Sequence, residues 1–214
     1  MLRRIALAPC LLLVSFCLHA TTYTLEPDYT QGVFRWNHLG FSSPAAQFSQ
    51  GTGTLEFDPA DPARSSVTVT IPLSTLYTGV PALDEDFRSK DFFDTAQFPS
   101  ATFTSARVEK GATRDRFKLI GELNLHGVTK PVTLEVTVVK VGTNPRTSLA
   151  TVGFDAVTTL RRSDFGLGKY VPQVSDEIQM RIIVQAVEAT SYAAYLKERA
   201  AAAAAKAKDA APKQ

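Results

Sequence analysis

The chain is poor in the residues that carry covalent and metal chemistry. Among 214 residues it has two cysteines, three histidines and one tryptophan. Both cysteines, Cys10 and Cys17, lie in the first 20 residues, so the rest of the chain offers no disulfide, thiol nucleophile or thiolate ligand. Only His38 and His126 follow residue 20, without an acidic partner spaced along a helix. We therefore expect no metal site.

Sequence motifs of the common enzyme classes are also missing. The chain has no Gly-x-Ser-x-Gly nucleophile elbow and no glycine-rich phosphate loop. Without Arg3 and Arg4, the 23 basic residues become 21, against 21 acidic ones. A near-neutral chain without a basic cluster and interleaved aromatics predicts no nucleic-acid partner. We predict a protein that is not an enzyme and needs no cofactor.

The longest apolar run is too short for a comfortable membrane span. It covers residues 5–18, follows the basic Arg3 and Arg4, and ends in His19 and Ala20. A span needs about 20 residues, whereas this pattern is typical of a cleaved secretory signal. We predict a signal peptide at 1–20 and a periplasmic location. The alternatives are a retained anchor, or lipid attachment at Cys17, which the bulky Phe16 before it disfavours.

Apolar and polar residues alternate along much of the remaining chain. Such alternation is typical of strands with one apolar face. Valine, threonine and phenylalanine, which favour strands, are frequent in these runs. Five strong and three weaker runs predict about eight strands: 33–38, 67–71, 117–125, 132–138 and 178–184, then 48–57, 100–109 and 148–158.

Turn residues separate the runs by short connections, which favours hairpins. Glycines at or inside the runs predict bulges or bends, as a sheet needs in order to close on itself: Gly32, Gly51, Gly53, Gly121 and Gly153. One helix is expected over about 81–89, with Pro81 in its first turn and Leu83 and Phe87 on one face. We predict an all-β, closed antiparallel barrel with short flanking helices.

The strand pattern stops at about residue 190. Residues 191–214 read SYAAYLKERAAAAAAKAKDAAPKQ, and their alanines predict a helix to about Lys208. Tyr192, Tyr195 and Leu196 are expected to dock its first turns, while the far end has little to bury. The predicted organisation is thus a signal at 1–20, a barrel domain at 21–189, and a helical or disordered Ala/Lys-rich tail at 190–214.

Few polar residues are candidates for a site. His38 is predicted either to contact a ligand head group at the barrel mouth or to be a hydrogen-bonded structural residue, and His126 is expected to be structural or solvent-facing. The acidic group at 84–86 suits a solvated helix N-terminus, or a carboxylate with a raised pKa. The segment 161–164, RRSD, is expected to brace a turn through Asp164 or to clamp an anionic head group.

Aromatic side chains form the other notable cluster: Phe92, Phe93, Phe98 and Phe103. They are predicted either to pack in the core or to line a lipid cavity. Burying one CH₂ group is worth about 0.8 kcal/mol, so ~20 buried carbons would gain roughly 16 kcal/mol before association costs. An apolar tunnel can therefore bind a lipid without any diagnostic polar motif.

Four segments in a fixed order resemble one known family, the polyisoprenoid-binding YceI-like proteins of the periplasm. The resemblance spans about 22–189 and departs at Phe87, where leucine is common. The segments are YTLEP (23–27) with FRWNHLG (34–40), DFRSKDFFD (86–94) with FP (98–99) and ATF (101–103), GELNLHGVTKPV (121–132), and RSDFG (162–166) with SDEI (175–178).

This resemblance implies an eight-stranded antiparallel lipocalin-like β-barrel with a tunnel for an isoprenoid lipid, such as a quinone or a polyprenyl chain. It carries over no catalytic residue. A homodimer is a further possibility. We predict nine ligand-binding residues: Phe34, Trp36, His38, Phe92, Phe93, Phe103, Leu119, Arg162 and Phe165.

Two other hypotheses remain open from the sequence. One is a stress-response or interaction protein whose barrel interior is packed and whose working site is on the surface. The other is an enzyme that acts on a lipid head group through His38 and Arg162.

Overall fold

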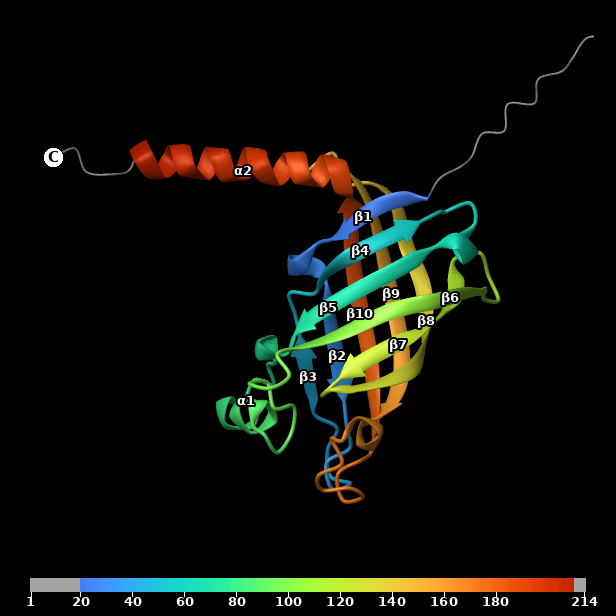
Figure 1. Cartoon of the computed structure of the whole chain (residues 1–214), viewed down its shortest axis with the longest axis vertical. Helices are drawn as coiled ribbons and strands as arrows, with labels where there is room; N and C mark the ends of the chain where they lie inside the picture. The colour runs from blue at the N-terminus through green and yellow to red at the C-terminus, as the bar shows by residue number, and fades with distance from the viewer. Residues whose placement is uncertain (1–19, 210–214) are drawn as a thin grey trace, which may run out of the picture.

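The computed structural model describes residues 20–209 and consists mainly of strands (Figure 1). The predicted signal peptide at 1–20 lies outside the described residues, apart from Ala20. The elements, in order, are β1 (Thr21–Leu25), η1 (Pro27–Tyr29), β2 (Gln31–Arg35), β3 (Ala45–Phe48), β4 (Thr52–Phe57), η2 (Pro62–Arg64), β5 (Ser66–Pro72), η3 (Leu73–Thr75), α1 (Pro81–Arg88), β6 (Ser100–Lys110), β7 (Arg116–Leu125), β8 (Val128–Thr143), β9 (Ala150–Arg161), η4 (Arg162–Phe165), β10 (Glu177–Glu188) and α2 (Ala189–Asp209).

Eight strands close into an antiparallel ring. Each strand from β4 to β10 pairs with the next, β4 also pairs with β1, and β1 returns to β10. The register Tyr23↔Glu188 closes the ring. Closure leaves no open edge among these strands, which removes a site of unwanted strand pairing. The predicted closed, eight-stranded antiparallel barrel is confirmed.

At two places in the barrel wall the strand is broken into two consecutive pieces, β1 with β2 and β3 with β4. The sequence pattern did not predict these breaks. Along one edge of β10, β2 pairs with residues 179–183 and β1 with residues 186–188. The predicted strand 48–57 is likewise divided into β3 and β4. Both breaks meet where the Gly51 N–H donates to the carbonyl of Thr30 at 3.1 Å. A Cβ at Gly51 would lie 2.6 Å from Cγ2 of the buried Thr30, so a larger residue would force the Thr30 side chain to move.

Two of the predicted glycine positions coincide with irregularities in the barrel. The β6–β7 register shifts between Ser105 and Arg107, where Ser105 pairs with Gly121. The β8–β9 register shifts between Val138 and Lys140, where Lys140 pairs with Gly153. A bulge increases the local twist of its strand, and such twist helps a sheet to close.

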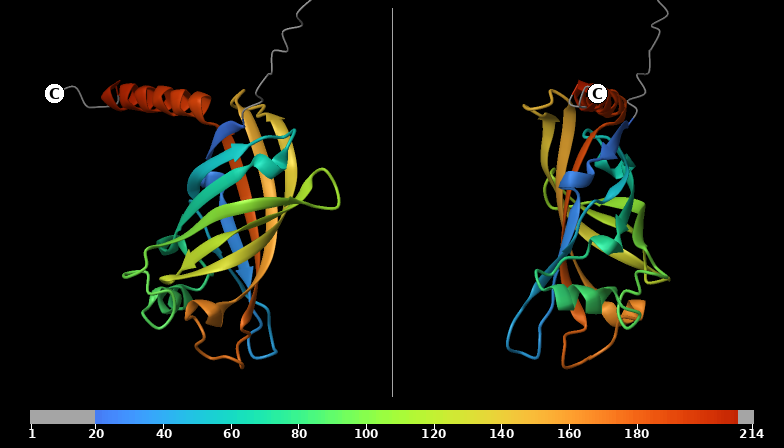
Figure 2. Two further views of the ribbon diagram at one scale, coloured as in Figure 1. Left: turned by 45° about the vertical axis from the view of Figure 1, so that its right-hand side comes forward. Right: turned by 90° about the vertical axis from the view of Figure 1, so that its left-hand side faces the viewer.

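Helices lie at the two ends of the barrel (Figures 1 and 2). α1, near the lower end, packs Phe87 against Phe34 and Trp36, with ring centroids 6.4 and 5.4 Å apart. α2 begins directly after β10 at the upper end and projects away from the barrel. Tyr192 is buried there, whereas Leu196 is exposed, so the predicted docking patch is smaller than expected. Within residues 20–209 no helix is both long and apolar enough to cross a membrane.

Candidate binding cavity

The barrel encloses one large apolar cavity of about 630 Å³. This volume is within the range of about 300–1,000 Å³ that is usual for ligand pockets. Its wall follows the alternation of the strands. On β7, for example, the lining residues are Phe117, Leu119, Leu123 and Leu125, and the eight steps from residue 117 to residue 125 span roughly 26 Å.

The interior differs between the two ends of the barrel. At the upper end Leu25, Val152 and Ala186 are at most 1% exposed and belong to a core cluster with Tyr23 and Phe57. Along the cavity, inward-facing Phe103, Leu119 and Met180 stay partly exposed because they border open space. The packed interior that the interaction-protein hypothesis requires is therefore not the arrangement found.

All nine residues predicted to contact a ligand line this one cavity. Phe34 and Trp36 come from β2 and its end, Phe103 and Leu119 from β6 and β7, and Phe165 from η4. Phe92, Phe93, His38 and Arg162 lie nearer the lower end, on loops or on η4. The structure thus brings the nine together, while their contact with a ligand stays a prediction.

Aromatic rings form the wall beside α1. Phe34 lies 5.5 Å from Phe48 and 6.4 Å from Phe93, measured between ring centroids. Phe93 meets Phe48 edge to face at 5.4 Å. Edge-to-face and offset contacts of this kind are favourable beyond their buried area. These aromatic contacts hold strands β2 and β3 against the segment that follows α1. The two strands are otherwise joined to the closed ring of strands through the pairing of β2 with β10.

The cavity opens at the lower end, where several of its lining residues are exposed. These are His38 and Ser42 after β2, Asp86 on α1, Asp91 after it, and Tyr170 before β10. At the opposite end Ser66 is the exposed lining residue among those described. We refer to the lower opening, bordered by these five residues, as the mouth.

An ion pair joins two loops across the mouth. The Lys169 ammonium donates to Asp91 Oδ2 at 2.6 Å, and it also lies 5.5 Å from the centre of the Phe92 ring. The hydrogen bond and charge of Lys169 lower the pKa of Asp91, and those of Asp91 raise the pKa of Lys169. Both groups therefore stay charged at neutral pH. Tyr170 packs on Phe92 with centroids 6.2 Å apart.

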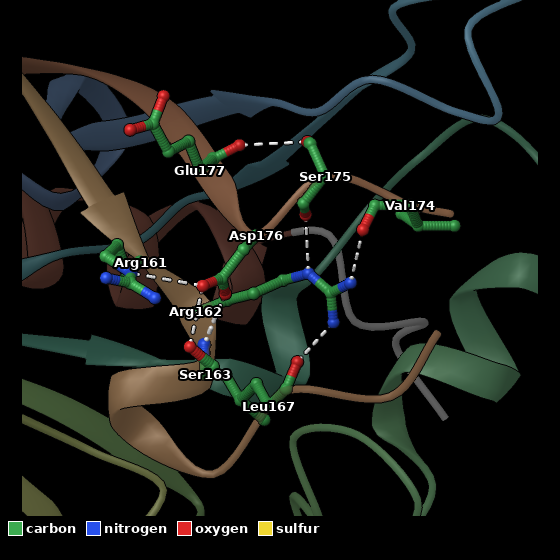
Figure 3. A network of polar contacts seen from close by, with 8 residues as sticks. All are labelled: Arg161, Arg162, Ser163, Leu167, Val174, Ser175, Asp176 and Glu177. Carbon is green, nitrogen blue, oxygen red and sulfur yellow. Dashed lines mark hydrogen bonds and ion pairs between the residues drawn. The ribbon is translucent and has the colours of Figure 1, made fainter. Parts of the chain in front are cut away.

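Arg162 braces the mouth and is not free to clamp an anion (Figure 3). Its guanidinium donates to the carbonyls of Ser175 at 2.8 Å, Val174 at 3.0 Å and Lys169 at 2.8 Å, and also to that of Leu167. Four of its five N–H groups are thus engaged. Burial lowers the pKa of Arg162. The sequence predicted that this segment braces a turn through Asp164. That partner was wrong, because Arg162 braces the turn through backbone carbonyls.

Asp176 is the carboxylate that serves this turn. It accepts hydrogen bonds from the Ser163 backbone N–H at 2.8 Å, from the Ser163 hydroxyl at 2.7 Å and from Arg161 Nε at 3.2 Å. Burial acts to raise the pKa of Asp176, but these donors outweigh it and the pKa is lowered. Sequence proximity favoured Asp164. The chain returns antiparallel, however, and places residue 176 beside residue 163.

The two histidines have different surroundings. His38 is exposed, and among the described residues only its backbone makes hydrogen bonds, to Ser42 and Phe41. The expectation of a hydrogen-bonded structural residue is therefore not met at His38. His126 has a structural role, as expected: its Nδ1 lies 3.1 Å from the Phe165 carbonyl oxygen, and its ring packs on Phe98 at 4.7 Å. Phe98, unlike the other aromatic candidates, does not line the cavity.

Asp84 is buried, so the expectation of a solvated acidic helix N-terminus is met by Glu85 and Asp86 but was wrong for Asp84. Its Oδ1 accepts hydrogen bonds from both the backbone N–H and the hydroxyl of Thr78, each at 2.6 Å. These bonds, led by that of the Thr78 hydroxyl, lower the pKa of Asp84. The shift is opposite to the raised pKa that was the alternative expectation for this acidic group. The carboxylate fixes the loop that enters α1.

Three residues at the mouth were not predicted from the sequence to belong to the site: Asp91, Lys169 and Tyr170. The motif DFRSKDFFD contains Asp91, but only the fold brings residue 169 across to it. No group of three or more His, Cys, Asp or Glu side chains is arranged to hold a metal ion in the described part of the chain.

The fold and the cavity define a closed antiparallel β-barrel with an internal apolar cavity. The YceI-like domain model matches residues 23–186. Protein YceI of Escherichia coli O157:H7 is 37% identical over 155 residues, which is 72% of this chain and 80% of that relative. The chain belongs to the YceI-like family.

Solved structures share the fold. The crystal structure of Burkholderia cenocepacia BcnA matches with a TM-score of 0.65 at 26% identity, over 73% of this chain and 95% of that one. A polyisoprenoid binding domain from Saccharophagus degradans matches with a TM-score of 0.62 at 14% identity, over 79% of this chain and 99% of that one. At 14% identity the likeness is one of fold.

Proposed function

We propose that this protein binds one long-chain apolar lipid, of the polyisoprenoid class, in its barrel cavity and carries or stores it in the periplasm. The observation that carries the proposal is the hollow apolar interior, which reaches the surface at the mouth. Leaving Phe103, Leu119 and Met180 beside open space forfeits burial energy, and an apolar occupant would recover it.

Three further findings support the ligand class and the compartment. The neighbour from Saccharophagus degradans with the same fold is described as polyisoprenoid binding. The cavity is long, because its wall follows β7 from Phe117 to Leu125, and this shape suits a chain better than a compact ligand. The sequence at 1–20, with its basic start and apolar run, is typical of an exported protein.

The role proposed is binding rather than turnover. Arg162, which the enzyme hypothesis needs near the head group, is engaged by backbone carbonyls. His38 and Ser42 at the mouth have polar atoms that a quinone or alcohol head group can hydrogen-bond. Recognition would then combine a few polar contacts at the mouth with an apolar wall behind them.

Lipid extraction tests this proposal. The protein is expressed in a bacterial periplasm, purified without detergent and extracted with organic solvent, and the extract is analysed by mass spectrometry. The expected result is about one isoprenoid or other long-chain lipid per protein. The single tryptophan, Trp36, lines the cavity, so added quinones should quench its fluorescence.

A matched pair of variants assigns the lipid to the cavity. Ala156→Phe places a ring in the cavity, whereas Val157→Phe, one residue further along β9, points outward because Val157 is 51% exposed. We expect lipid loss in the first and retention in the second, with circular dichroism to confirm that both fold. The proposal would be refuted if the wild-type protein contains no lipid and its Trp36 fluorescence does not change on addition of a panel of quinones and polyprenyl alcohols.

A further inference from the structure

Two loops lie side by side at the lower tip of the barrel. They are residues 37–44, between β2 and β3, and residues 166–175, between η4 and β10 (Figure 2). The Leu39 N–H donates to the Gln173 carbonyl at 3.2 Å, and the Ser175 N–H to the Asn37 carbonyl at 3.0 Å. We call this pair of loops the tip. Both chain ends described, the start of β1 and α2, lie at the opposite end (Figure 1).

Large apolar side chains project from the tip into solvent. Phe41 is 91% exposed, the highest value among the exposed large apolar residues described, and Tyr170 is 58% exposed. Leu39 and Val171, beside them, are exposed as well. Leu39 and Tyr170 have φ angles of 57° and 66°, which are unusual for residues other than glycine. The backbone thus adopts costly turns where these side chains are presented.

The tip is almost free of charge. Residues 37–44 contain no acidic residue, lysine or arginine, and residues 166–175 contain only Lys169. The charge of Lys169 is paired with Asp91. An exposed patch that combines aromatic rings with few charges suits a medium that does not solvate ions, and aromatic side chains are common at membrane–water interfaces.

The tip also borders the mouth of the cavity. His38, Ser42 and Tyr170 belong to the tip and line the cavity at the same time. A polyisoprenoid is nearly insoluble in water, so its source must be an apolar phase in contact with the mouth. We propose that the tip inserts into a lipid bilayer and that the ligand passes between bilayer and cavity at this contact. This inference rests on the function proposed above and names the surface with which the mouth exchanges ligand.

Vesicle flotation tests the docking itself. The protein, wild type or variant, is floated with phosphatidylethanolamine/phosphatidylglycerol vesicles, and its bound fraction is measured. Phe41→Ser removes the most exposed aromatic ring, and Leu39→Asn keeps a residue that tolerates positive φ. Each is expected to weaken vesicle binding, Phe41→Ser by roughly tenfold or more. Val139→Ser, on β8, removes another exposed apolar side chain and should leave binding unchanged.

Three results would overturn the docking proposal: no vesicle binding by the wild type, equal losses in Phe41→Ser and Val139→Ser, or a dimer that Phe41→Ser dissociates without any vesicle binding. The last would assign the tip to a second copy of the chain.

Ligand transfer separates this proposal from the proposed function. Trp36 quenching is recorded with a quinone delivered from cyclodextrin and, separately, from vesicles. With cyclodextrin, we expect Trp36 in Phe41→Ser to be quenched at the wild-type rate. With vesicles, we expect quenching to be slower in Phe41→Ser than in the wild type, and its rate to depend on vesicle concentration. If cyclodextrin delivery does not quench Trp36, the lipid-binding function is refuted. If cyclodextrin delivery quenches Trp36 but transfer from vesicles is equally fast in Phe41→Ser and the wild type, only the docking is refuted.

Discussion

The two ends of the barrel follow the same alternation of side chains but differ inside. At the upper end Leu25, Val152 and Ala186 are at most 1% exposed and do not line the cavity, whose wall there is formed by Phe57 and Phe154, 5.2 Å apart. Toward the lower end Leu119 and Phe103 point inward and border open space. Alternation therefore decides which side chains point inward, and the contacts across the barrel decide whether they fill it.

This difference separates stability from binding. Buried contacts at the upper end contribute to folding, because the apolar area of Leu25 is removed from water in the folded protein. The wall of the cavity keeps accessible apolar area that only a ligand can cover. We therefore expect similar substitutions at the two ends to have different consequences.

The largest expected difference is between Leu25→Ala and Leu119→Ala. Leu25→Ala should destabilise the protein by about 2–5 kcal/mol, because it leaves a void in a packed region. Leu119→Ala should cost clearly less, since its side chain already borders a cavity, but should weaken binding of a long lipid. Denaturant unfolding and a lipid titration measure the two effects. Equal stability losses would contradict the distinction between a filled and a hollow end.

Arg162→Met should give the next largest effect. It removes the donors to the carbonyls of Lys169, Val174 and Ser175, at a cost of about 2 kcal/mol once water partly replaces them. Faster hydrogen exchange should be confined to residues 166–176. Arg161→Met, which loses only the ion pair between the exposed Arg161 side chain and Asp176, is the control and should change less. If the two variants behave alike, Arg162 does not brace the mouth.

Asp91→Asn should mainly affect the mouth. The Asp91–Lys169 pair is partly exposed, so its loss should change stability little and accelerate lipid release about two- to fivefold. Glu85→Gln on α1 removes an exposed carboxylate that does not line the cavity, and should leave release unchanged. About 0.5 M salt should reduce the difference from wild type through screening. Slower release in Asp91→Asn would contradict a restraining role for the pair.

The smallest expected effect concerns α2 at the filled end. Glu188 accepts hydrogen bonds from Ser191 and Thr190, led by that of the Ser191 hydroxyl, and these lower the pKa of Glu188 from 4.5 to about 2. A lowered pKa stabilises the folded form above pH 4.5, and this contribution is lost as pH falls toward 2. The start of α2 should therefore loosen over this range in the wild type, by hydrogen exchange. In Glu188→Gln the same dependence should be weaker, and an unchanged dependence would exclude Glu188 as its source.

Much of the fold was predictable because it depends on local patterns. Alternation located most strands, Pro81 and the alanines predicted both helices, and Gly121 and Gly153 indicated irregular pairing. β1 and β3 were missed as separate strands because each is short and next to a break. The break at Gly51 depends on its contact with Thr30, which is 21 residues away in the sequence.

The candidate site was predictable in composition but not in arrangement. All nine predicted residues line the cavity, because apolar inward positions and the family motifs both favoured them. The partners of Arg162, the burial of Asp84 and the Asp91–Lys169 pair depend on contacts between segments up to 78 residues apart. Periodicity in a sequence contains no information on such pairings.

A chain-length series tests the central claim, that the barrel interior holds a cavity for one long apolar chain, most directly. Straight-chain alcohols of increasing length are titrated into the delipidated protein, and binding is followed by Trp36 fluorescence. Affinity should rise about fourfold per added CH₂ until the chain fills the cavity, at about 16 carbons for a tilted wall of this length, and then level off. Affinity that is independent of chain length, or identical in Ala156→Phe and wild type, would contradict the account.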